Sequence, residues 1–156
     1  MKTKCSLMVA VSGLFLILAN TAFAAPIPCT GAGSIRRVRN TAIGNYEYVI
    51  FDYVPPPAAS YSVTAVPPSF TEDEGADPGT VSGNKFKQIR FKALTWTCTI
   101  NQSFSLPKTA IKGIKKTGQF EAVITYVVGY RTASTYLNTY SYNVGPIKKV
   151  VMQFRR

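Results

Sequence analysis

The chain has 156 residues, with 18 Lys or Arg, 7 Asp or Glu and no histidine. The lack of histidine removes the commonest general base and metal ligand, and the phosphate-binding motifs GxxxxGK[ST] and GxGxxG are absent as well. We therefore expect neither an enzyme nor a cofactor.

Residues 1–24 have the three parts of an export signal. Lys2 and Lys4 provide the positive start, and 6–18 form an apolar stretch shorter than the ~20 residues that a membrane span requires. Ala22 and Ala24 fit a signal peptidase site, so we predict cleavage after Ala24. The mature protein would be in the periplasm, in the cell wall or outside the cell; a retained membrane anchor is the alternative.

The mature chain is predicted to form one domain, residues 34–156, preceded by an N-terminal arm, 25–33. It retains two cysteines, and in an oxidising compartment we expect a disulfide between Cys29 and Cys98, two free thiols being the alternative. The Pro- and Gly-containing segment 67–83 is predicted to be a mobile loop.

Charge is distributed unevenly along the mature chain. It has 16 basic and 7 acidic residues, a net charge of +9, and four of the acids, Glu72, Asp73, Glu74 and Asp77, lie in the predicted loop. The remaining surface is therefore strongly basic and would attract polyanions, in the cell envelope an anionic polymer or glycan rather than specific nucleic acid. The alternative is that the positive charge only maintains solubility.

An internal repeat relates segments 35–50 and 111–124, if a gap of two residues is allowed at 42–43. Six of the 14 aligned pairs are identical, and the alignment matches Glu47 with Glu121 and Gly44 with Gly118. Each copy is predicted to form a β-hairpin, whose turn lies at Gly44 in the first and at Gly118 in the second.

The remaining mature chain is rich in β-branched and aromatic residues and shows no sustained helical period. Four further strands are predicted, together with a bridging strand at 96–104. The four are 60–66, 86–94, 135–143 and 149–154. We therefore expect an all-β fold, a β-sandwich of two similar sheets of about four strands that arose by internal duplication.

The basic strands are the favoured binding elements, because Arg and Lys suit the carboxylates and phosphates of envelope polymers. The candidates are Arg36, Arg37, Arg39, Lys112, Lys115, Lys116, Lys148 and Lys149. Exposed Tyr136, Tyr140 and Tyr142 would stack on sugar rings; the alternative is that their alternation marks only the inner face of a strand.

Glu47 and Glu121 raise the alternative of a hydrolase with paired carboxylates. We favour a structural role, in which each glutamate pairs with a basic residue of the neighbouring strand. The expected partners are Arg36, Arg37 or Arg39 in one half and Lys112 or Lys115 in the other.

The segment IKGIKKTGQFEAVITYVVGY, with the Tyr-rich strand and GPIKKVVMQF after it, resembles the AMIN and AMIN-like domains of bacterial envelope proteins. The resemblance extends to IRRVRNTAIGNYEYVIFDY in the first half. It implies a sandwich of two similar sheets and a non-catalytic module that directs a partner protein to peptidoglycan or the division site.

Together these features predict an exported, monomeric binding module of the bacterial cell envelope. Its partner would be peptidoglycan, another anionic polymer, or an envelope protein. The alternative, from another functional class, is a secreted protein-binding or inhibitor module that uses the acids of 72–77.

Overall fold

The computed structural model describes residues 27–68, 81–94 and 98–156, and these contain nine β-strands and no helix. None of the described segments is therefore a helix that could cross a membrane. The predicted export signal lies outside the described residues. The strands are β1 (Ser34–Ile43), β2 (Tyr46–Val54), β3 (Ser60–Val66), β4 (Lys85–Lys92), β5 (Asn101–Ser103), β6 (Ile111–Phe120), β7 (Val123–Tyr130), β8 (Thr135–Val144) and β9 (Ile147–Arg155).

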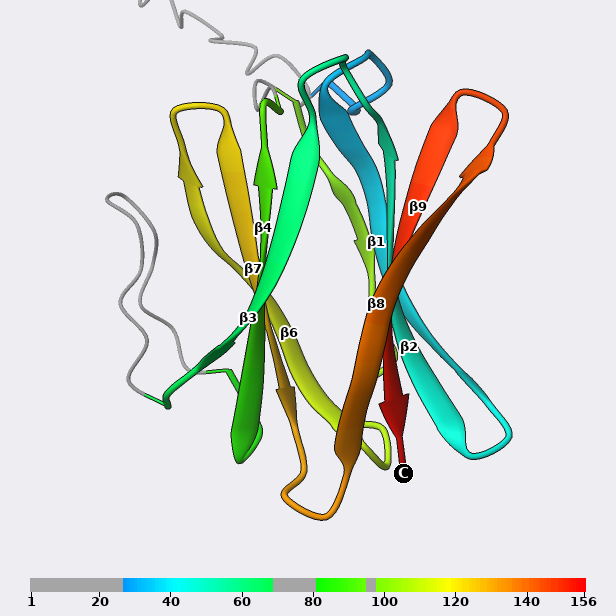
Figure 1. Cartoon of the computed structure of the whole chain (residues 1–156), viewed down its shortest axis with the longest axis vertical. Helices are drawn as coiled ribbons and strands as arrows, with labels where there is room; N and C mark the ends of the chain where they lie inside the picture. The colour runs from blue at the N-terminus through cyan, green and yellow to red at the C-terminus, as the bar shows by residue number, and fades with distance from the viewer. Residues whose placement is uncertain (1–26, 69–80, 95–97) are drawn as a thin grey trace, which may run out of the picture.

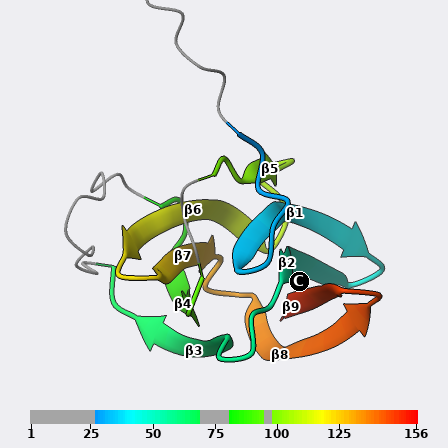
Figure 2. The ribbon, with the colours of Figure 1, turned by 90° about the horizontal axis from the view of Figure 1, so that it is seen from above.

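Two sheets pack face to face, as Figures 1 and 2 show, so the predicted all-β sandwich is confirmed. The five-stranded sheet has the order β5-β1-β2-β9-β8, and the four-stranded sheet has the order β3-β4-β7-β6. All pairings are antiparallel except that of β5 with β1, which is parallel.

Alternate residues of the central strands form the core, because successive side chains of a strand point to opposite faces. In β2 the inward side chains are those of Glu47, Val49, Phe51 and Tyr53, all fully buried. The ring of Phe51 lies 5.1 Å from that of Phe91 in the other sheet, in the tilted arrangement that aromatic rings prefer. These contacts join the two sheets across the core.

The topology of the two halves is related by a pseudo-twofold arrangement. Replacing β1, β2, β3 and β4 by β6, β7, β8 and β9 converts the order β1-β2-β9-β8 into β6-β7-β4-β3. Each half therefore contributes its first hairpin to one sheet and its second hairpin to the other. The sheets are similar, as the duplication predicts, but neither sheet is built from one half alone.

The turn predicted at Gly118 is wrong. β6 continues through Gly118 to Phe120, and the turn to β7 is Glu121-Ala122, with φ of 45° and 61°. The first hairpin does turn at Gly44-Asn45, with Gly44 at φ 54°. Two-residue turns with positive φ usually contain Gly or Asn, so the sequence Glu-Ala does not signal this turn.

A disulfide joins Cys29 to Cys98, with 4.9 Å between the two Cα atoms, and confirms the predicted pairing. It holds the N-terminal arm against the segment before β5, where the amide of Cys29 donates to the carbonyl oxygen of Thr99. The bridging strand predicted at 96–104 is shorter than expected. Only Asn101–Ser103 is a strand, it pairs with β1, and 95–97 lie outside the described residues.

The end of the predicted loop 67–83 is packed rather than free. Val81 is buried against Phe86 and Val127 on the outer face of the four-stranded sheet. A Cβ on Gly129 would lie 2.1 Å from the carbonyl oxygen of Ser82, so only glycine permits this close approach. Residues 69–80, which carry the four acids, lie outside the described residues.

Candidate functional site

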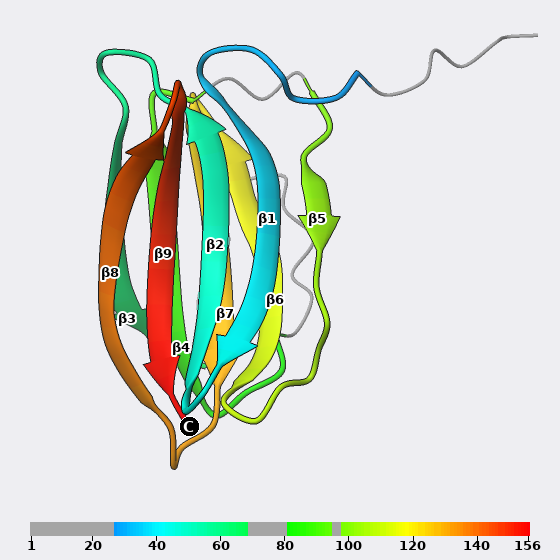
Figure 3. The same ribbon diagram turned by 90° about the vertical axis from the view of Figure 1, so that its right-hand side faces the viewer.

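The outer face of the five-stranded sheet carries most of the predicted binding residues that the fold brings together. Strands β1, β2, β9 and β8 lie side by side in this sheet (Figure 3). Their register aligns residues of the four strands in rows. One row is Arg37, Asp52, Lys149 and Tyr142, and the next is Arg39, Ile50, Val151 and Tyr140. Cations, aromatic rings and aliphatic side chains therefore share a single surface, with the arginines on β1 and the tyrosines on β8.

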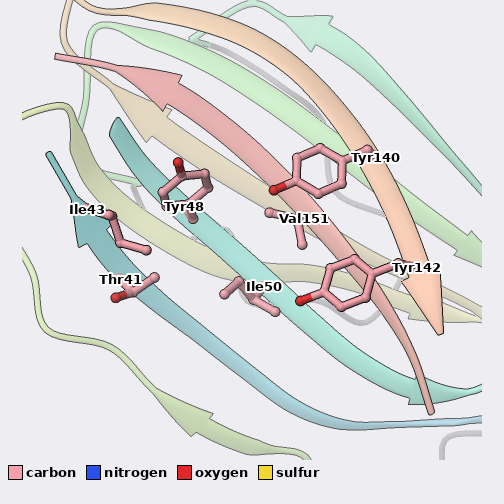
Figure 4. A pocket seen from close by; sticks show the side chains of 7 residues that line it. All are labelled: Thr41, Ile43, Tyr48, Ile50, Tyr140, Tyr142 and Val151. Atoms are coloured by element: carbon pink, nitrogen blue, oxygen red, sulfur yellow. The ribbon is translucent and has the colours of Figure 1, made fainter. Parts of the chain in front are cut away.

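A groove of about 200 Å³ lies in this face, and we call it the tyrosine groove (Figure 4). It is lined by Thr41, Ile43, Tyr48, Ile50, Tyr140, Tyr142 and Val151. Its volume is below the ~300 Å³ at which enclosed small-molecule pockets begin, so it suits one unit of an extended ligand.

The two tyrosines of β8 form one wall of the groove. The rings of Tyr140 and Tyr142 are stacked with centroids 6.5 Å apart, and their exposed fractions are 41 % and 47 %. Burial, with smaller contributions from the neighbouring hydroxyls of Tyr48 and Tyr142, raises the pKa of Tyr140 above its usual value. The phenol is therefore neutral at physiological pH, and it presents an apolar ring with a hydroxyl that can form hydrogen bonds.

A group of charges lies beside the tyrosine groove. Asp52 is largely buried and accepts a hydrogen bond of 2.9 Å from Nζ of Lys149, while Nη2 of Arg39 lies 3.7 Å from its other oxygen. Arg37 is exposed and lies opposite Asp52 in the register. The three cations exceed the one carboxylate, so this part of the face is positive and suits an anionic ligand.

The fold separates the other predicted cations from this surface. The guanidinium of Arg36 donates to the carbonyl oxygen of Thr30, and Lys148 lies opposite the inward-facing Tyr53. Lys112 donates to the carbonyl oxygen of Lys108, and Lys116 donates to Oε1 of Gln119. Lys112, Lys115 and Lys116 belong to β6 in the other sheet, so the basic strands of the two halves do not form one patch.

Tyr136 does not lie with Tyr140 and Tyr142. Its ring packs against Phe154 of the core, 5.5 Å away, because a β-bulge between Tyr136 and Asn138 reverses the alternation of β8. Of the three tyrosines, only Tyr136 therefore lies on the inner face of the strand, the alternative that the sequence left open for all three.

Sequence reasoning did not identify Tyr48, Ile50 and Val151, which contribute to the groove from β2 and β9. The charged residues of each strand lie on both faces, Glu47 and Asp52 in β2 and Lys148 and Lys149 in β9, so composition does not reveal which alternate set faces outward. The sequence signal that could have located them is the charge of Asp52 and Lys149. These residues are two positions from Ile50 and Val151 and therefore lie on the same face of their strands.

The two glutamates do not occupy equivalent places. Glu47 is fully buried in β2 and pairs with Arg156, not with a basic residue of β1, while Asp52 takes the pairing with Arg39. Glu121 lies in the exposed turn between β6 and β7. The alignment placed them together because it matched Gly118 with the turn residue Gly44.

Among the described residues, no three His, Cys, Asp or Glu side chains are grouped closely enough to bind a metal ion. Comparisons with models of known protein families, with curated proteins and with solved structures found no match to this chain. The resemblance to AMIN domains therefore stays a prediction.

Proposed function

We propose that this protein is an exported, non-catalytic module that binds an anionic glycan polymer of the bacterial cell envelope, such as peptidoglycan. The observation that carries the proposal is the stacked pair Tyr140 and Tyr142, which shares one open face with Lys149 on the neighbouring strand and with Arg37 and Arg39 two strands further on. A role in directing a partner protein to the envelope follows from the resemblance to AMIN domains.

The chemistry of the face matches that of an acidic glycan. Aromatic rings stack on the apolar faces of sugars, and guanidinium and ammonium groups bind carboxylates. The tyrosine groove is open and small, so each contact is with one unit of a chain, and a long polymer would make several weak contacts.

Two features support the export that this function requires. The disulfide between Cys29 and Cys98 is compatible with an oxidising compartment, and the sequence of 1–24 has the pattern of a cleaved signal.

Sedimentation with purified peptidoglycan tests the proposal. We expect the wild-type protein to sediment with the polymer at low salt, and the double variant Tyr140→Ala with Tyr142→Ala to lose at least about tenfold in affinity, since aromatic stacking contributes ~1 kcal/mol per ring. Phe120→Ala is the matched control, because Phe120 is equally exposed but lies in the other sheet. Lack of retention at low salt would refute the proposal.

The contribution of charge is tested separately. Arg37→Gln with Arg39→Gln should weaken binding and reduce its dependence on salt, because fewer cations then meet the polymer. Lys92→Gln with Arg131→Gln removes the same charge from exposed positions of β4 and the segment after β7. Equal losses from both pairs would indicate general attraction by net charge and no site on this face.

Two alternatives give different results in these experiments. A protein-binding or inhibitor module using the acids of 72–77 would not depend on Tyr140 and Tyr142, and those acids lie outside the described residues.

A hydrolase would need Glu47 or Glu121, but Glu47 has no accessible surface and its oxygens already accept hydrogen bonds. Glu47→Gln and Glu121→Gln should leave binding to peptidoglycan intact in the folded protein.

A further inference from the structure

The edges of the two sheets differ in how they are protected against pairing with another strand. Exposed edges usually carry charges, prolines or bulges, or are short, because their free backbone groups otherwise recruit a further strand. β5 has three residues, and β6 carries three lysines and two register shifts. β3 has seven uncharged residues and is followed by Pro67 and Pro68.

β8 is the exception. It has ten residues without a charge, a proline or a glycine, and in the described part of the chain it pairs only with β9 (Figure 3). Its single bulge lies near one end, so Asn138–Val144 forms a regular seven-residue ladder with β9. The apolar side chains of Tyr140, Tyr142 and Val144 are exposed along this segment.

We propose that β8 pairs antiparallel with β8 of a second copy and forms a dimer with one continuous sheet. Charge and length together favour this occupant in a chain of net charge +9: strands β1, β6 and β9 would bring like charges together, β8 has none, and the uncharged β3 is shorter and is followed by two prolines. This inference goes beyond the proposed function and does not depend on it. It replaces the monomer expected from the sequence.

The regular segment also defines the register. Its centre is Ser141, so a twofold axis there pairs every residue from Asn138 to Val144. Tyr140 then lies opposite Tyr142 of the second copy, and Asn138 lies opposite Val144. Side chains opposite each other in an antiparallel pair share a face, so the two tyrosine grooves would lie on the same side of the extended sheet.

Light scattering after size exclusion, over a concentration series and without polymer, tests the dimer. The wild-type protein should show the mass of two chains. Asn138→Lys with Val144→Lys should give monomers, because lysines then oppose each other, and Asn138→Glu with Val144→Lys should restore the dimer through opposite charges. Circular dichroism melts check that both variants are folded.

The salt dependence separates this inference from the proposed function. Added salt should favour the dimer, because it screens repulsion between two basic chains, while it should weaken binding to an anionic polymer. A wild-type monomer at all concentrations would overturn the proposal and leave β8 open to a strand of another protein. The proposal would also be overturned if Asn138→Lys with Val144→Lys remained dimeric. It would likewise be overturned if Asn138→Glu with Val144→Lys were folded but monomeric.

Discussion

Glu47 connects the two sheets at a single carboxylate. It belongs to β2 of the five-stranded sheet, and its oxygens accept hydrogen bonds from the amides of Ala110 (3.0 Å) and Ile111 (2.8 Å) at the start of β6. Nε of Arg156, at the end of the chain, donates a further bond of 3.0 Å. A buried charge is tolerated only when it is paired and hydrogen-bonded in this way.

Replacement of Glu47 should therefore lower stability. Glu47→Gln keeps the shape of the side chain but removes the charge and turns an NH₂ group toward amide donors. We expect the free energy of unfolding to fall by roughly 1–3 kcal/mol, measured by urea denaturation at pH 7. Glu121→Gln, in the exposed turn, should have little effect; an equal loss for both variants would contradict this role of Glu47.

The stabilisation by Glu47 should also depend on pH. Burial raises its pKa, but the hydrogen bonds from Ile111, Ala110 and Arg156 together outweigh burial and leave the pKa below its ordinary value of 4.5. The unfolded chain therefore binds the proton first as the pH falls. The contribution of Glu47 is complete above pH 4.5 and is lost as the pH falls through the lower, folded pKa.

Urea denaturation of the wild-type protein and Glu47→Gln, repeated from pH 7 down to pH 3, tests this dependence. The difference in stability between them should be constant above pH 4.5 and should shrink at lower pH. A difference that grows on acidification would contradict the lowered pKa.

The hairpin of β6 and β7 has a turn that its residues do not favour. Glu121 and Ala122 both have positive φ, a conformation that costs an L-residue roughly 1–2 kcal/mol and that Asn and Gly adopt more readily. The long β-ladder on either side therefore determines the position of the turn. The hairpin of β8 and β9 differs, because its turn begins with Gly145 at φ 56°.

The double substitution Glu121→Asn with Ala122→Gly should accordingly stabilise the fold by about 1 kcal/mol. Its urea midpoint should rise, with no change in binding to peptidoglycan. Gly145→Ala provides the opposite case and should lower the midpoint, since alanine is strained at that φ. A lower midpoint for the double variant would mean that the side chain of Glu121 stabilises the turn.

The disulfide links the N-terminal arm to the chain before β5 across 69 residues. Cross-linking positions this far apart lowers the entropy of the unfolded chain, which corresponds to about 4 kcal/mol of stability in the chain-entropy model. The bond acts together with the pairing of β5 with β1 and with the hydrogen bonds between Asn40 and Ser105 to hold this segment beside β1.

Cys29→Ser with Cys98→Ser should therefore unfold at a much lower urea concentration than the wild-type protein. The expected loss is about 4 kcal/mol, and reduction of the wild-type protein should reproduce it. Binding by the tyrosine groove should persist in the folded variant, because the groove residues of β1, Thr41 and Ile43, lie at the end of that strand away from Cys29 and the other lining residues lie on β2, β8 and β9. An unchanged midpoint would show that the arm contributes nothing to global stability.

The sequence predicted the positions of the strands accurately, but it predicted less well which face of the sheet each side chain occupies. β-Branched and aromatic runs located β3 at its observed bounds, and the remaining main strands within a few residues. The alternation of tyrosines in β8 was recognised, but the bulge after Tyr136 depends on pairing with β9 and could not be inferred. One residue added to one strand reverses all the faces beyond it.

Composition and local pattern alone determined an all-β protein with two related halves, and they predicted a disulfide with two free thiols as the alternative. β-propensity, cysteine number and repetition are properties of the chain and need no partner. Only the tertiary structure decided that the halves exchange their second hairpins, that Glu47 is buried while Glu121 is exposed, and that Tyr140 and Tyr142 share one face with Arg39 and Lys149. These features depend on register and on pairing between segments far apart in the sequence, which local propensity does not encode.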